Sequence, residues 1–172
     1  MIVVDANVVV AMLLDNTFTA HARAVHLRDA TWVTHPLCQS EVLNALLQET
    51  KARKIALQDA VNAAETAAHL LTERADGCEP STVLTTAHSS GLTAYDATYV
   101  VLARSLGVPL ITEDKEILRA CPDVALTMRQ FLTPPETPLA VREKRVAYRT
   151  RSTAKKRAAG QGKAPGGRKG KR

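Results

Sequence analysis

The stretch most diagnostic of the architecture is Ala94-Tyr-Asp96-Ala-Thr-Tyr-Val-Val-Leu-Ala-Arg-Ser-Leu-Gly-Val-Pro-Leu-Ile-Thr112-Glu-Asp114. Its first part has apolar residues at helical spacing, predicted to begin at Thr93 and to end before Gly107. Residues 108–112 follow as a short strand with a proline near its start, and Asp114 comes directly after it. A helix, a tight turn and a strand in this order are typical of an α/β layer fold.

The same alternation runs through the rest of residues 1–132. Strands are predicted at residues 2–4, 31–34 and 124–127, and a strand or turn at residues 78–80. Helices are predicted at residues 8–14, 18–28, 37–54, 57–74, 81–89, 93–106 and 115–120. Trp32, Tyr95 and Tyr99 are expected in the core. The elements together predict an α/β protein with a mainly parallel central sheet.

Charge divides the chain into two parts. Residues 1–132 contain 10 Lys/Arg and 15 Asp/Glu, whereas residues 133–172 contain 13 Lys/Arg and 2 Asp/Glu. Prolines mark the boundary, and from about Ser152 the composition of Ala, Gly, Lys and Arg is unable to bury a core. Residues 1–132 are therefore predicted to be one domain and residues 133–172 a basic disordered tail, with a basic helix at residues 139–150 as an open alternative. An acidic body with a basic tail favours a polyanionic partner such as nucleic acid.

Several other classes of protein are disfavoured. No apolar stretch approaches the roughly 20 residues that span a bilayer, and the chain starts with a strand rather than a leader, so a cytoplasmic location is expected. Three widely spaced cysteines without a C-x-x-C pair are expected to be reduced thiols. The histidines form no H-E-x-x-H motif, and no Walker-type phosphate loop is present in the sequence.

Four acidic residues, Asp5, Glu41, Asp96 and Asp114, stand where a strand gives way to a helix or in the first turns of a helix. Each has a structural explanation: Asp5 and Asp114 can cap the helices that follow them, Thr93 and Asp96 have capping-box spacing, and Glu41 can be a solvated helix residue. Taken together they indicate a divalent-metal site, because clustered carboxylates repel one another unless a proton or a cation neutralises them. Oxygen ligands favour Mg²⁺ or Mn²⁺ over zinc.

Simple sheet geometry brings only part of this set together. Asp5 and Asp114 each follow a parallel strand, so they are expected side by side at the carboxyl edge of the sheet. Asp96 begins a helix that leads into a strand, and we expect it at the other edge unless its helix enters at a different angle. Glu41, which shares a polar helix face with Asn44, presents the same difficulty.

A family resemblance bears on this difficulty. The order and separation of four stretches resemble the PIN-domain ribonucleases, and among them the VapC-type toxins: Val4-Asp5-Ala-Asn7, Ser40-Glu41-Val-Leu-Asn44-Ala-Leu, Tyr95-Asp96-Ala-Thr-Tyr-Val-Val-Leu-Ala and Leu110-Ile-Thr112-Glu-Asp114. The most specific element is the Tyr-Asp-Ala block followed about eighteen residues later by Thr-x-Asp. The resemblance covers residues 1–132 and implies a three-layer α/β/α sandwich in which the four acids meet at one edge.

Carried over by position, the resemblance implies a catalytic pocket of Asp5, Glu41, Asp96 and Asp114. Of these, Asp5, Asp96 and Asp114 are the implied metal ligands. Asn7 and Thr112 match positions that shape the pocket, and Thr112 is expected to hydrogen-bond a ligand carboxylate.

The implied activity is Mg²⁺-dependent hydrolysis of RNA at internal phosphodiester bonds, with Mn²⁺ as an alternative ion and 5′-phosphate and 3′-hydroxyl products. The implied setting is a toxin–antitoxin pair with a small antitoxin protein as partner. A stand-alone RNA-processing nuclease and a non-catalytic RNA- or protein-binding module remain alternatives, as does a homodimer. The tail is not explained by the resemblance; its cations are expected to contact RNA or the ribosome.

Overall fold

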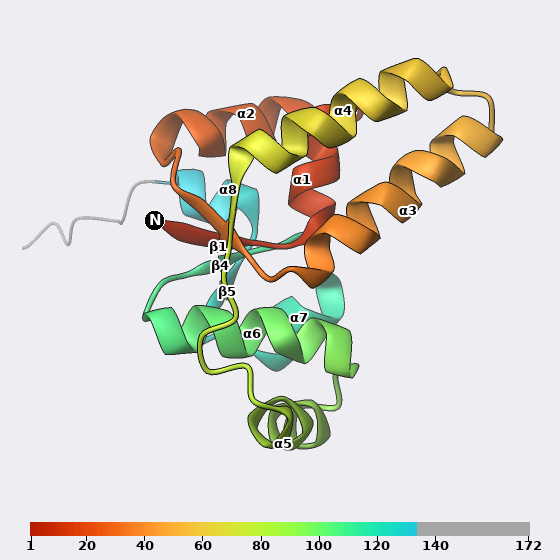
Figure 1. Cartoon of the computed structure of the whole chain (residues 1–172). Coiled ribbons are helices and arrows are strands. Elements are labelled where there is room, and N and C mark those ends of the chain that lie inside the picture. The colour runs from red at the N-terminus through yellow and green to blue at the C-terminus, as the bar shows by residue number, and fades with distance from the viewer. Residues whose placement is uncertain (134–172) are drawn as a thin grey trace, which may run out of the picture. The chain divides into compact units, whose positions relative to one another are not determined.

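A five-stranded, wholly parallel sheet runs through the middle of the fold in the computed structural model, which describes residues 1–133 (Figure 1). The strand order is β3-β2-β1-β4-β5. The strands are β1 (Ile2–Val4), β2 (Trp32–Thr34), β3 (Leu71–Glu73), β4 (Leu110–Ile111) and β5 (Ala125–Leu126). β1 is central, and its residue Val3 is paired with Val33 on one side and with Leu110 on the other.

Helices cover both faces of this sheet (Figure 1). One face carries α1 (Ala6–Leu13), α2 (Thr19–Arg28), α3 (Leu37–Lys51), α4 (Leu57–Leu70) and α8 (Met128–Leu132). The other carries α5 (Pro80–Ser90), α6 (Ala94–Leu106) and α7 (Lys115–Ala120). The direction in which the chain crosses the sheet decides which face the connecting helices cover, because crossovers between parallel strands are right-handed. The chain moves from β1 through β2 to β3 in one direction and then from β3 past β1 to β4 in the opposite direction, so the two sets of connecting helices lie on opposite faces. The predicted three-layer α/β/α sandwich is confirmed.

The core lies around β1 and α6. Every residue of β1 is at most 1% exposed, and the middle of α6 is buried without interruption from Ala97 to Ala103. Trp32 and Tyr99 belong to this core, as predicted. The same prediction for Tyr95 is wrong, because its side chain is 64% exposed. Residues 93–95 are all exposed, so the start of α6 lies outside the core.

One element prediction near the sheet edges is wrong, and one helix was missed. The helix predicted for residues 57–74 ends at Leu70, and the chain passes directly into β3, which pairs with β2. α8 was not predicted, although Thr127 and Gln130 form a capping box at its start. The predicted basic helix at residues 139–150, and the tail from residue 134 onward, lie outside the described residues. No helix in residues 1–133 is long and apolar enough to cross a bilayer.

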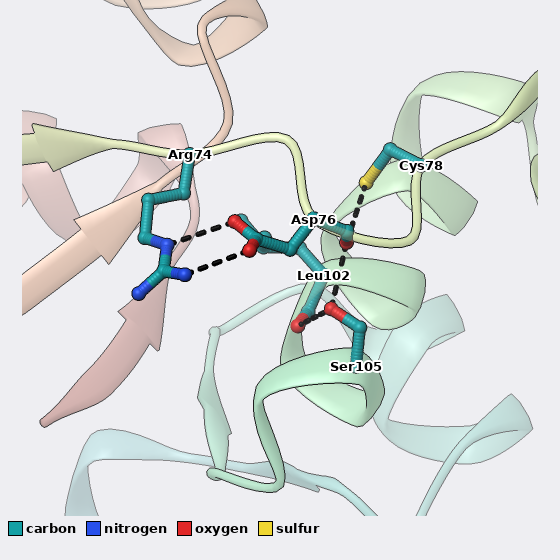
Figure 2. A network of polar contacts seen from close by, with 5 residues as sticks. All are labelled: Arg74, Asp76, Cys78, Leu102 and Ser105. Atoms are coloured by element: carbon teal, nitrogen blue, oxygen red, sulfur yellow. Dashed lines mark hydrogen bonds and ion pairs between the residues drawn. The ribbon is translucent and has the colours of Figure 1, made fainter.

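The loop between β3 and α5 is fastened to α6 by polar contacts (Figure 2). Arg74 donates two hydrogen bonds to the Asp76 carboxylate, at 2.7 and 2.8 Å. The Asp76 carbonyl accepts from the Ser105 hydroxyl at 2.6 Å and from the Cys78 thiol at 3.6 Å. Gly77 has φ +71°, and a Cβ atom there would lie 2.7 Å from the Ser105 Cβ. A glycine is therefore required where the chain crosses from one face of the sheet to the other.

Candidate functional site

The four acids predicted as a site line one cleft of about 220 Å³ at the carboxyl edge of the sheet. They come from separate elements: Asp5 follows β1, Glu41 lies in α3, Asp96 lies in the first turn of α6 and Asp114 precedes α7. The cleft is lined by Asp5, Ala6, Asn7, Val10, Glu41, Asn44, Ala45, Asp96, Tyr99, Asp114 and Ile117.

The difficulty expected for Asp96 and Glu41 does not arise, and the geometric expectation behind it was wrong. α6 ends at Leu106 and β4 begins at Leu110, so the end of α6 lies at the amino edge of the sheet. A helix of 13 residues then reaches back about 20 Å, which brings its first turn to the carboxyl edge. α3 begins shortly after β2 ends, so its first turns lie at the same edge. Helices antiparallel to the strands thus bring all four acids together.

Asp5 is the most buried of the acids, at 4% exposed. Its Oδ1 accepts a hydrogen bond of 3.0 Å from the Val8 N–H, which caps α1, and its Oδ2 accepts one from the Thr112 hydroxyl. The pKa of Asp5 is raised from 3.8 to about 6, chiefly by burial and also by the negative charges of Asp114 and Glu41, while the two hydrogen bonds oppose the rise. The hydrogen bond expected from Thr112 to a site carboxylate is present, and the Thr112 oxygen also accepts from the Asp114 N–H at 2.9 Å.

Asp114 and Asp96 are also held at the starts of their helices. Asp114 Oδ1 caps α7 by accepting from the backbone N–H groups of Glu116 and Ile117, at 2.7 and 3.0 Å. Asp96 Oδ2 accepts a hydrogen bond of 2.7 Å from the Thr93 hydroxyl. The backbone N–H of Asp96 donates one of 3.2 Å to the Thr93 Oγ1. Asp114 and Asp96 can therefore stabilise the starts of their helices and also serve the site. In both residues the second carboxylate oxygen is free of hydrogen bonds within residues 1–133.

Glu41 is held differently, because it caps no helix. Its Oε2 accepts a hydrogen bond from the Tyr99 hydroxyl, and Tyr99 lies on α6, on the opposite face of the sheet. The sequence identified Tyr99 only as a core residue; the available signal was its position three residues after Asp96, one helical turn further along the same face. Asn7 and Asn44 also line the cleft and are exposed.

The chemistry of the lining fits a hydrated divalent cation. The cleft contains four carboxylates and no Lys, Arg or His side chain within the described residues, so its negative charge is not neutralised by the protein. The starts of α1, α6 and α7 lie beside it, and their N-terminal partial charges offset part of that negative charge. Among residues 1–133, no three His, Cys, Asp or Glu side chains are close enough to enclose a metal ion. Mg²⁺ fits this arrangement, because it usually retains several waters and binds through one or two carboxylates.

Glu113 lies next to this site in sequence but outside its lining. Its Oε1 accepts a hydrogen bond of 2.9 Å from the Met128 N–H at the start of α8. Glu113 therefore belongs to the packing of α8, and within residues 1–133 the acids that line the cleft are the four that the sequence indicated.

A doubly wound α/β fold with carboxylates at its topological switch point defines a class of proteins that bind ligands at the carboxyl edge of the sheet. Residues 2–121 match the model of the PIN domain, and the chain belongs to this family. PIN domains are generally nucleases, that is, hydrolases, and typically use divalent metals.

One solved structure that resembles the chain is the crystal structure of PAE2754 from Pyrobaculum aerophilum. It is 27% identical in sequence, with a TM-score of 0.62, and the match covers 76% of this chain and 92% of that one. No curated protein sequence matches the chain. The structural likeness thus spans nearly all of the related protein and agrees with the family assignment.

Proposed function

We propose that this protein is an endoribonuclease that depends on Mg²⁺, or alternatively on Mn²⁺, and hydrolyses phosphodiester bonds within RNA. The observation that carries the proposal is the convergence of Asp5, Glu41, Asp96 and Asp114 from separate elements on one cleft. Membership of the PIN domain family supports nuclease chemistry at that cleft. The cytoplasm is the compartment in which we expect it to act.

Within this proposal, Asp5 and Asp96 are the principal ligands of a hydrated ion, and Asp114 binds it through one of its waters. When bound, the ion supplies positive charge to a phosphodiester oxygen and makes an attacking water more acidic. Thr112 and Thr93 fix the orientation of the aspartates through the hydrogen bonds described above. Glu41 has one oxygen free of hydrogen bonds within residues 1–133; it completes the shell of the ion through a bound water, and it orients that water or accepts its proton. The exposed amides of Asn7 and Asn44 are placed to donate hydrogen bonds to the RNA.

We further propose that the protein is the toxin of a VapBC-type pair, with a small antitoxin as partner. The residue pattern of the cleft supports this assignment. An apolar groove of about 420 Å³ also lies along α3 and α4, lined by Gln39, Val42, Leu43, Ala64, Ala67, Ala68, Leu71 and Glu73. A groove-filling segment of the antitoxin would bind near the acids, and a basic residue on it would occupy the acidic cleft. A homodimer and contact of the tail with RNA or the ribosome are parts of the same proposal.

Cleavage of labelled structured RNAs by antitoxin-free protein tests the nuclease proposal. Wild type should cleave with Mg²⁺ or Mn²⁺, whereas Asp96→Asn and chelator-treated wild type should not. Asparagine retains an oxygen that can accept the Thr93 hydrogen bond, so the variant removes charge and leaves the helix start intact. Equal cleavage by all three samples would indicate a contaminating nuclease.

Two other outcomes favour the alternatives. Tight RNA binding without cleavage would favour a non-catalytic binding module of the same fold. Cleavage by a protein whose expression does not inhibit growth would favour a stand-alone RNA-processing nuclease over a toxin.

A further inference from the structure

The bond between Tyr99 and Glu41 joins the two faces of the sheet at the cleft. Glu41 is on α3 and Tyr99 on α6, and 58 positions separate them in sequence. Tyr99 also stands one helical turn after Asp96 on α6, and both side chains line the cleft. The hydrogen bond from the Tyr99 hydroxyl therefore connects Glu41 to the helix that carries Asp96.

Glu41 depends on this contact more than the other acids depend on theirs. Asp5 and Asp114 accept backbone N–H groups of their own helices, and Asp96 accepts the hydroxyl of Thr93 just before its helix. Glu41 has a longer side chain and, within residues 1–133, accepts a hydrogen bond only from Tyr99. A free glutamate loses considerable rotamer freedom when it is fixed, so without an anchor its carboxylate would sample several orientations.

Tyr99 is well placed to serve as that anchor. Its side chain is 2% exposed and packed in the core, so the direction of its hydroxyl is set by the packing around the ring. The buried Cys38 thiol lies beside the same hydroxyl, and burial, together with the neighbouring Cys38 and Glu41 side chains, raises the pKa of Tyr99 far above its ordinary value of 10. The hydroxyl is therefore placed to donate its hydrogen bond to Glu41 Oε2.

We infer that Tyr99 is a positioning residue that holds one oxygen of Glu41 and directs the other into the cleft, an inference that rests on the proposed function. Removing the hydroxyl frees the Glu41 carboxylate and weakens the hold of the cleft on a divalent ion. RNA binding through the exposed surface does not change, because Tyr99 is buried beneath the cleft.

The test compares the full-length wild type with Tyr99→Phe, Glu41→Gln and the double variant. Phenylalanine keeps the ring in the core and removes only the hydroxyl. Tyr95→Phe is the matched control, because Tyr95 lies on the same helix, is 64% exposed and has a hydroxyl that makes no hydrogen bond within residues 1–133. Thermal unfolding of each variant verifies that it is folded.

Two quantities are measured, the affinity for Mn²⁺ by electron paramagnetic resonance and the single-turnover rate of RNA cleavage at saturating RNA. Tyr99→Phe should lower both about 10- to 100-fold, the range typical of residues that orient metal ligands. Its RNA affinity without divalent ions should match wild type, and Tyr95→Phe should match wild type throughout. In the Glu41→Gln background, Tyr99→Phe should have no further effect, because the group it orients has lost its charge.

Two results would overturn the positioning role alone. The first is a Tyr99→Phe variant with wild-type Mn²⁺ affinity. The second is a Tyr99→Phe change that lowers Mn²⁺ affinity by the same factor in the wild-type and the Glu41→Gln backgrounds. Loss of Mn²⁺ affinity in Tyr99→Phe, together with a wild type that cleaves no RNA, would support the positioning role and overturn the nuclease proposal. A wild type that binds no Mn²⁺ would overturn both.

Discussion

The buried carboxyl of Asp5 should make the metal-free protein less stable as the pH rises, and Asp5→Asn should remove this dependence. Burial raises the pKa of Asp5 from 3.8 to about 6, so between these values the native state retains a proton that the unfolded chain has released. The free energy of unfolding falls with pH wherever the native state binds more protons. The contribution of Asp5 to stability is thus fully present below pH 3.8 and lost as the pH rises through about 6.

The size of the effect follows from the difference in pKa. A pKa difference of about 2 corresponds to about 3 kcal/mol of unfolding free energy. About 1 kcal/mol of this is already lost at pH 4.5, which leaves about 2 kcal/mol between pH 4.5 and 7.5. Domains of this kind are stable by only about 5–15 kcal/mol, so the change is measurable. Asparagine can still accept from the Val8 N–H, and its mismatch with the Thr112 hydroxyl costs about 1 kcal/mol at every pH.

Urea unfolding in the presence of a chelator provides the assay. Trp32 is the single tryptophan and is 1% exposed, so its fluorescence reports global unfolding. The unfolding free energy of Asp5→Asn minus that of wild type should increase by about 2 kcal/mol from pH 4.5 to 7.5. Asp15→Asn is the control, because the Asp15 side chain is 98% exposed. A difference between Asp5→Asn and wild type that does not change with pH would refute the reasoning.

Three further predictions concern the caps, the crossing loop and the tail. Asp114→Ala should lower the unfolding free energy by about 1 kcal/mol through loss of the α7 cap, whereas Asp114→Asn should not; equal losses in urea unfolding would contradict the capping role. Gly77→Ala should cost at least about 2 kcal/mol, because it combines a positive φ with a clash at Ser105, and a wild-type melting temperature would refute this. Truncation after Thr133 should weaken RNA binding and flatten its salt dependence; an unchanged salt slope would exclude the tail from the contact.

The sequence predicted the order of strands and helices because that order depends on local patterns. The meeting of all four acids was implied by the family resemblance, since simple sheet geometry brought together only Asp5 and Asp114. β1, β2, β4 and β5 lie within the predicted segments, and the helix predicted at residues 115–120 begins and ends as expected. Asp5 and Asp114 could be placed from the sequence, because each directly follows a strand and precedes a helix. An acid in that position caps the helix and lies at the carboxyl edge of the sheet.

The errors have identifiable physical causes. β3 follows α4 with no glycine or proline between them, and its extended backbone results from pairing with β2, a contact that local pattern does not encode. α8 was missed although Thr127 and Gln130 carried its capping signal. The role of Tyr99 was hidden because an aromatic residue in a helix looks the same in sequence whether its hydroxyl is solvated or bonded to a site carboxylate.

Asp5 and Asp114 each cap a helix and also line the cleft, which affects which site residues would change if activity were lost. A homologue without nuclease activity would still need a capping side chain, Asp or Asn, at positions 5 and 114, because these residues begin α1 and α7. Selection for folding alone would keep Asp or Asn at both positions, so an aspartate there in a homologue is weak support for catalysis. Glu41 begins no helix, and its contact with Tyr99 serves the cleft. The first substitutions in an inactive lineage should therefore accumulate at Glu41, and this position is the informative one when activity is judged from sequence.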